Sequence, residues 1–426
     1  MPFYRIIDHN GYKFVVTPNN EPVFISGVNH IGDGSIYPLE LKKRFGSRKE
    51  WRRSVANNIR RWKFHALGPA PAAHAPANHQ LAPEDYQSQL IVTSDWTPEE
   101  YAELDIPFFY MIQLPGYEEM KPWTFQGDLF SDEFARSIDE RCRYPCSQLR
   151  ENPNLIGYFF CHNPPWSIFS YGFEGCCADW ISTLLQPPNT PARHQWKLLM
   201  QRLYGSLECY SQVYAPIESF DDILTMPYPL RGIGSAAKMR EDMRAFSILM
   251  AERWYSLWHQ AIRRYDPYHL ICGDRLTAHR SVIPEYILPV MDPYIDLLAV
   301  NMMAPPQQTM ENLRSTFMVW EKPILIADCG ARPYDGQLKS GHWVKSDRDV
   351  GRFLRAHYEL AIQHPSLVGL LWCGYWETSV AHSGICHWIT GQPNAKLVRA
   401  FSRHNHWVQL ALKEHLHNLG YPISSP

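Results

Sequence analysis

The segment KPILIADCG, residues 322–330, is an unbroken apolar run that ends in an acid, Asp328. Four consecutive apolar residues do not alternate with polar ones, so both faces of such a strand are expected to be buried. Strands buried on both faces are typical of parallel sheets whose faces are covered by helices. The segment therefore predicts one strand of a helix-covered parallel sheet, with a carboxylate at its carboxyl end.

Seven further runs of this kind occur along the chain. They lie near residues 22–29, 63–68, 106–112, 155–163, 269–275, 295–301 and 367–377. Between them are helix-like segments, such as residues 47–62 and 241–265, in which apolar residues recur at spacings of three and four. Eight alternating strands and helices predict an α/β fold of the (β/α)8 TIM barrel type.

We expect residues 1–426 to form a single barrel domain with two additions. Residues 1–25 contain two apolar runs separated by a turn at Asn10 and Gly11, which predicts an N-terminal β-hairpin. Residues 167–240 are too long for a plain connection and are expected to form an insertion after strand four.

Composition narrows the class of protein. The 426 residues are 45% hydrophobic, and 41 Lys and Arg residues nearly balance 43 Asp and Glu residues, giving a formal charge of −2. This balance offers no overall field for nucleic acid or anionic membranes, and neither partner is expected. The amino-terminal residues lack a basic segment followed by a long apolar run, which predicts a cytoplasmic protein. The oligomeric state is not indicated.

Metal and cofactor motifs are not found in the sequence. The ten cysteines contain no CxxC pair, and the 19 histidines show no HExxH pattern. No metal and no cofactor are therefore expected.

Catalytic groups of this fold lie at the carboxyl ends of the strands, so the residues that close each run are the candidates. They are Asn29, His30, His162, Asn163, Asp274, Arg275, Asn301, Asp328 and Glu377. Asp328 is predicted to be catalytic, because burial at the rim of a barrel can tune a carboxylate. Asp274 is predicted to be a second catalytic carboxylate that faces Asp328 across the mouth, although Asp274 and Arg275 could also simply pair with other rim groups.

Aromatic residues gather at the same strand ends. Trp166, Trp372 and Trp376 are predicted to bind substrate, because aromatic rings stack on the C–H faces of sugars. Glu377 is predicted to bind substrate as well, or to serve in place of Asp274 as the second carboxylate. The remaining strand-end residues, Asn29, His30, His162, Asn163, Arg275 and Asn301, are predicted to contact the substrate.

The order and spacing of these segments resemble a family of barrel glycoside hydrolases that includes the exo-acting β-agarases. The likeness covers most of the chain, with NPNLIGYFFCHNPPW (152–166) similar to the family's fourth strand and KPILIADCGA (322–331) to its seventh. In that family an Asn-Glu pair ends strand four and supplies the acid/base, and a glutamate nucleophile ends strand seven. The matching residues here are His162, Asn163 and Asp328.

This resemblance implies a hydrolase whose acid has moved. Asn163 cannot replace the acid/base glutamate, and Asp328 is one methylene shorter than the nucleophile. An inverting mechanism with Asp328 and Asp274 is therefore expected, acting on a short oligosaccharide or glycoside. Two alternatives are a catalytically degenerate barrel that binds a sugar, and a barrel lyase or isomerase that uses His30 or His162 as a base.

Overall fold

The computed structural model describes most of the chain. The described residues are 2–31, 43–69, 71–73, 92–94, 96–112, 127–162, 166, 178–227, 229–277, 285–333, 342–376, 384–387 and 391–423. The expected strand at each of the eight apolar runs lies largely within these ranges.

Eight parallel strands close into a barrel, which confirms the predicted fold class. In barrel order they are β4 (Ile25–Val28), β5 (Ala66–Leu67), β8 (Phe108–Met111), β9 (Leu155–His162), β10 (Leu270–Thr277), β11 (Leu298–Asn301), β12 (Ile324–Cys329) and β15 (Leu367–Trp372). The last strand pairs with the first through Trp372 and Val28, so the sheet has no free edge.

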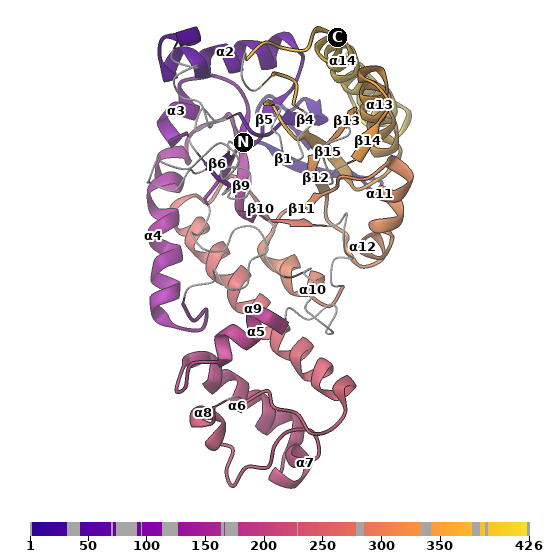
Figure 1. The fold of residues 1–426 in the computed structure, drawn as a ribbon. Coiled ribbons are helices and arrows are strands. Elements are labelled where there is room, and N and C mark those ends of the chain that lie inside the picture. The colour runs from indigo at the N-terminus through magenta and orange to yellow at the C-terminus, as the bar shows by residue number, and fades with distance from the viewer. Residues whose placement is uncertain are drawn as a thin grey trace.

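Helices surround the barrel (Figure 1). The larger ones are α2 (Arg48–Arg61), α4 (Asp132–Leu149), α9 (Ala236–Tyr265), α13 (Asp347–Gln363) and α14 (Ala395–Asn418). Shorter ones are α3 (Pro98–Ala102), α10 (Leu288–Met291), the 3-10 helix η4 (Asp292–Tyr294), α11 (Pro306–Asn312) and α12 (Arg314–Val319). Within the described ranges, no helix combines the length and the apolar character that a membrane crossing requires.

The amino-terminal segment closes the end of the barrel at which the strands begin. It forms a three-stranded antiparallel sheet of β1 (Arg5–His9), β2 (Tyr12–Val16) and β3 (Pro22–Val23). Val15 and Val23 of this sheet pack in the same core as Ile25 and Phe109 of the barrel interior. The predicted hairpin is thus confirmed, and it leaves the opposite end of the barrel for a site.

Two small sheets lie outside the barrel. They are β6 (Pro71–Ala73) with β7 (Val92–Ser94), and β13 (Ala331–Pro333) with β14 (His342–Val344).

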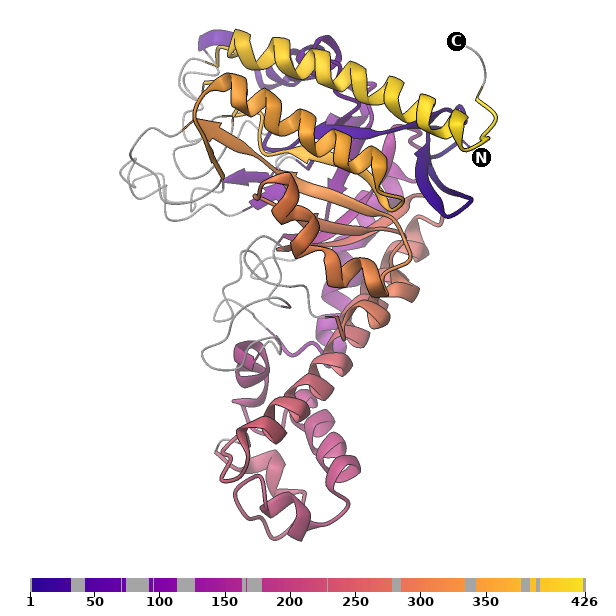
Figure 2. The ribbon, with the colours of Figure 1, turned by 90° about the vertical axis from the view of Figure 1, so that its right-hand side faces the viewer.

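The chain between β9 and β10 forms a helical lobe, at the place in the sequence where the insertion was predicted. It contains α5 (Ala178–Leu185), α6 (Pro191–Tyr204), α7 (Leu207–Ser211) and α8 (Asp222–Thr225), and the long helix α9 joins it to the barrel (Figure 2). The fully buried Arg193 ties the lobe together, because its guanidinium donates to the carbonyl groups of Leu185, Ile223 and Met226.

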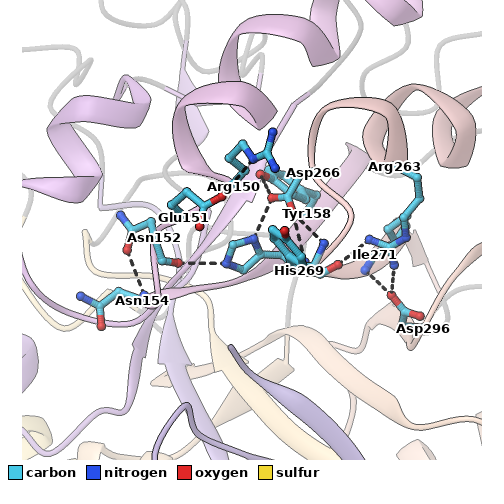
Figure 3. Close-up of polar contacts among 11 residues, drawn as sticks. Arg150, Glu151, Asn152, Asn154, Tyr158, Arg263, Asp266, His269, Ile271 and Asp296 are labelled. Atoms are coloured by element: carbon cyan, nitrogen blue, oxygen red, sulfur yellow. Dashed lines mark hydrogen bonds and ion pairs between the residues drawn. The ribbon is translucent and has the colours of Figure 1, made fainter. Parts of the chain in front are cut away.

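A buried polar network fixes the start of β9 against the start of β10 (Figure 3). Asp266 accepts hydrogen bonds from the Tyr158 hydroxyl at 2.7 Å and contacts Nδ1 of His269 at 2.7 Å. The other ring nitrogen of His269 lies 2.9 Å from the carbonyl oxygen of Asn152, in the turn before β9. Burial acts to raise the pKa of Asp266, but His269, Tyr158 and the Tyr268 amide outweigh it and hold that pKa below its usual value.

We predict that Asp266→Asn destabilises the protein by about 3 kcal/mol near neutral pH, because one partner of a buried pair is lost. A carboxyl group with a lowered pKa stabilises the fold above its unfolded pKa and loses that contribution as the pH falls through the folded value. The difference between variant and wild type in urea unfolding should therefore shrink in acid. Glu50→Gln, which removes an exposed partner of Arg53, is the control and should cost less than about 0.5 kcal/mol. An equal cost for both variants would contradict the prediction.

Candidate active site

Asp328 reaches the mouth of the barrel through an irregularity in β12. Leu325 and Ala327 belong to the inner core, so strict alternation would turn Asp328 outward. The pairing of β12 with β11 shifts by one residue just before Asp328, and Cys329 packs in the outer core instead. This bulge turns the Asp328 side chain toward the barrel interior.

Two donors hold the carboxylate there. Nδ2 of Asn29 donates to Oδ1 of Asp328 at 2.9 Å, and Nη2 of Arg275 lies 3.3 Å from Oδ2. The same two nitrogen atoms donate to the carbonyl oxygen of Ala327 at 2.8 and 2.7 Å. Asp328 is only 5% exposed, so these donors replace the water that would otherwise solvate its charge.

Arg275 is fully buried and lies over the ring of Phe159 in the barrel interior. Burial lowers the pKa of Arg275 from its usual value, and the charge of Asp328 acts in the opposite direction. Within the described part of the chain, its Nε and Nη1 atoms have no hydrogen-bond partner. Arg275 thus lies next to Asp328, and its predicted contact with substrate stays a prediction.

Asn29, His30 and Asn301 also lie at this end. Gly68 makes room for Asn29, because a Cβ atom at position 68 would lie 2.0 Å from Oδ1 of Asn29. Asn301 is buried and pairs in register with Asp328. His30 has a φ of 54°, in the left-handed region, and directly follows Asn29.

Cys373 belongs to the same group, although the sequence did not single it out. Donor atoms of His30, Asp328 and Cys373 all lie within 4.8 Å of one another. Burial and the neighbouring Asp328 both raise the pKa of the Cys373 thiol. Cys373 lies within the strand-eight run of residues 367–377 and directly follows Trp372, the last residue of β15. The adjacent Arg275 guanidinium would repel a metal cation, so we do not interpret these side chains as a metal centre.

The expectation that Asp274 faces Asp328 is wrong. Its Oδ2 atom accepts hydrogen bonds from Tyr255 at 2.7 Å, Trp254 at 3.0 Å and Trp166 at 3.3 Å. Tyr255 and Trp254 belong to α9, outside the barrel. The cause is a shift in the pairing of β10 with β9 around Gly273, which has a φ of 65°.

Burial raises the pKa of Asp274 to about 7, although the three side-chain donors favour the charged form. Its carboxyl group therefore titrates near neutrality in a closed environment between the barrel wall and α9. The geometry gives Asp274 a role in fixing β10 to that helix.

All three predicted sugar-stacking tryptophans are buried in the core, and Trp376 is only 6% exposed. Trp166 is fully buried and packs against Trp180 at a centroid distance of 4.7 Å. Trp372 is fully buried and packs against Phe401 of α14 at 4.9 Å. Both side chains point to the helix layer, so the substrate-binding prediction is wrong for them. One face of Trp376 is covered by Trp51, with the rings 4.5 Å apart and 15° from parallel.

Three of the predicted substrate-binding residues are not assigned a position in the site. Asn163 and Glu377 lie outside the described residues. His162 is the last residue of β9, and its backbone pairs in register with Arg275.

Comparisons with known proteins place the fold. No protein-family model and no curated protein sequence matches the chain. Solved structures do: an exo-β-agarase matches at 15% identity with a TM-score of 0.77, over 96% of this chain and 66% of that chain. An agarase, AgWH50C, matches at 15% identity with a TM-score of 0.76, over 96% of this chain and 65% of that chain. The structure of BpGH50 matches at 15% identity with a TM-score of 0.64, over 97% of this chain and 83% of that chain.

The chain thus spans about two thirds of the length of the first two structures. Likeness at this level of identity shows a shared fold, and it confirms the agarase-like barrel that the sequence resembles.

We predict that the stability of wild type falls relative to Asp274→Asn as the pH rises from about 4 to about 7. In this window the folded protein holds a proton on Asp274 that the unfolded chain has released, since a free carboxyl has a pKa of about 3.9. The slope should approach about 1.4 kcal/mol per pH unit. Urea unfolding of both proteins at about pH 5 and about pH 8 checks this. A difference that does not change with pH would show that Asp274 is ionised in the folded state throughout.

Proposed function

We propose that this protein is a glycoside hydrolase in which Asp328 supplies a catalytic carboxylate. The observation that carries the proposal is the position of Asp328 at the barrel mouth, held by Asn29 and Arg275. Active sites of this fold lie at that end of the barrel. The similarity in fold to an exo-β-agarase supports a glycosidic substrate.

The chemistry requires a negative charge beside the anomeric carbon, which becomes positive in the transition state. Asp328 provides such a charge, and the carboxylate is already oriented by its two donors. We propose that it acts as the base that activates water. Asp328 is one methylene shorter than the glutamate at this place in the family that the sequence resembles, which leaves room for water and favours inversion.

The acid is not Asp274, because that carboxyl group is bound to α9. We propose Glu377 for this role, since it is the last residue of the strand-eight run, residues 367–377. The proposed substrate is a short oligosaccharide or glycoside that enters by its chain end, which agrees with the exo action in the name of the similar agarase.

A sugar-binding barrel without catalysis is the second candidate. It is favoured by one observation: of Asp274 and Asp328, the two predicted catalytic carboxylates, only Asp328 points into the mouth. Such a protein would bind oligosaccharides and leave them intact.

We predict that Asp328→Asn lowers hydrolysis by a factor of about 10²–10⁴ and largely preserves sugar binding, because the amide keeps the shape and loses the charge. The measurement is turnover of aryl glycosides and short oligosaccharides, with binding followed by calorimetry and the product anomer by NMR. Asp8→Asn, at the exposed hairpin, is the control and should be as active as wild type.

Full activity of Asp328→Asn would remove its catalytic role. Sugar binding by wild type with no turnover of any substrate would favour the non-catalytic barrel. An unsaturated or isomerised product would point to the lyase or isomerase alternative.

We predict that Arg275→Lys lowers kcat about tenfold or more and leaves KM near its wild-type value, because Arg275 contacts Asp328 and lysine cannot reproduce both of its bonds. Steady-state kinetics separate the two constants, and the melting temperature reports on folding. A rise in KM at constant kcat would instead assign Arg275 to substrate binding, as the sequence predicted.

A further inference from the structure

A cleft lies on the outside of the barrel, between α13 and α14. The two helices run side by side (Figures 1 and 2), and a cleft with a volume of about 600 Å³ opens between them. They begin at the same end, because Nδ2 of Asn394 lies 3.3 Å from Oδ2 of Asp347. This volume is typical of small-molecule sites.

Small residues form the floor of the cleft. Gly351 of α13 faces Ala400 of α14 so closely that a Cβ atom at position 351 would lie 3.0 Å from the Ala400 Cβ. The close approach of the backbones leaves the long side chains on both sides to form the walls.

The walls are strongly basic. The cations are Arg348, Arg352, Arg355, Lys396, Arg399 and Arg403. On α13 they recur at spacings of four and three, and on α14 at spacings of three and four, so each helix presents one row toward the cleft. The acids in the lining are Asp347 and Glu359. Six cations against two acids stand out in a chain whose formal charge is −2.

Two of these six cations each form an ion pair, and the charge of Asp349 also acts on Arg348. Arg355 pairs with Glu359 at 2.7 Å, and Arg352 pairs with Asp349 at 2.8 Å. The remaining four cations, Arg348, Lys396, Arg399 and Arg403, form no ion pair with any residue in the described part of the chain. Like charges gathered without partners repel one another, and an anion between the rows would relieve that repulsion.

His404 supplies an independent observation at the floor. Its Nδ1 atom is buried and has no hydrogen-bond partner among the described residues, and its Nε2 atom approaches Gly351. Burial and the charges of Arg403 and Arg355 lower the pKa of His404 to about 4. The imidazole is therefore neutral near pH 7, and its Nε2 atom, which lies on the side of Gly351, can carry the proton and donate a hydrogen bond to a ligand.

We propose that the cleft between α13 and α14 binds a small ligand with two or more phosphate or sulfate groups. Guanidinium groups match the geometry of both oxyanions. Seven residues of helix span only about 10 Å, so each row is long enough for a small polyanion and short for a strand of nucleic acid. The cleft lies outside the barrel, so the proposal does not depend on the proposed hydrolase activity.

The test is calorimetric titration with tripolyphosphate and, separately, with a sulfated disaccharide at low ionic strength. We expect saturable binding of at least one of them, with one ligand per chain, that weakens as salt is added. The ligand that binds more tightly identifies the source of the oxyanion. The double variant R399Q/R403Q should weaken binding at least tenfold, while the control R202Q/R314Q removes the same charge from two exposed arginines outside the cleft and should bind as wild type does.

Position is checked by NMR, because the ring signals of His404 should shift on titration and should not shift in R399Q/R403Q. Asp328→Asn should bind the polyanion as wild type does, which separates this site from the barrel mouth. Equal weakening in both double variants would overturn the proposal, since it would reveal a general charge effect. Absence of binding to both probes, or binding of a single-stranded oligonucleotide alone, would overturn it as well.

Discussion

The candidate site depends on two donors that each bind the chain twice. Asn29 and Arg275 donate both to the Ala327 carbonyl and to the Asp328 carboxylate. The carbonyl bonds hold the bulge in β12, and the bulge is what turns Asp328 inward. Removing either donor would therefore leave a buried charge and a buried carbonyl under-solvated at the same time. One set of contacts therefore holds both the bulge in β12 and the Asp328 side chain.

Two bulges arrange the mouth in a complementary way. The shift in β12 brings an acid inward, and the shift in β10 around Gly273 brings Arg275 inward and sends Asp274 toward α9. If Asp274 faced inward as well, Arg275 would have to balance two buried carboxylates instead of one. The observed arrangement pairs one cation with one anion in the interior, and the second acid is satisfied by tryptophan and tyrosine donors in the outer layer.

The fold and the chemistry have separate origins in this chain. A barrel at 15% identity to an exo-β-agarase shows that patterned apolar strands suffice for the architecture. The proposed chemistry depends on a few strand-end side chains, and the charge pattern of α13 and α14 is a local property that a net charge of −2 conceals. A strongly basic surface can thus be present in a protein whose overall charge is close to zero.

The sequence alone determined the barrel, the hairpin and the position of Asp328 at the end of a strand, because eight unbroken apolar runs with polar ends are a periodic signal that needs no partner. It could not place Asp274 or Trp372, since a shift of one residue turns a side chain to the other face of a strand and leaves the sequence pattern unchanged. Trp166 follows the end of β9, and its place is set by contacts with Trp180 and Asp274. Only the fold brings Cys373 beside Asp328 and Gly68 against Asn29, since these partners are far apart along the chain. The cleft joins residues about fifty positions apart, and only the packing of two helices brings them together.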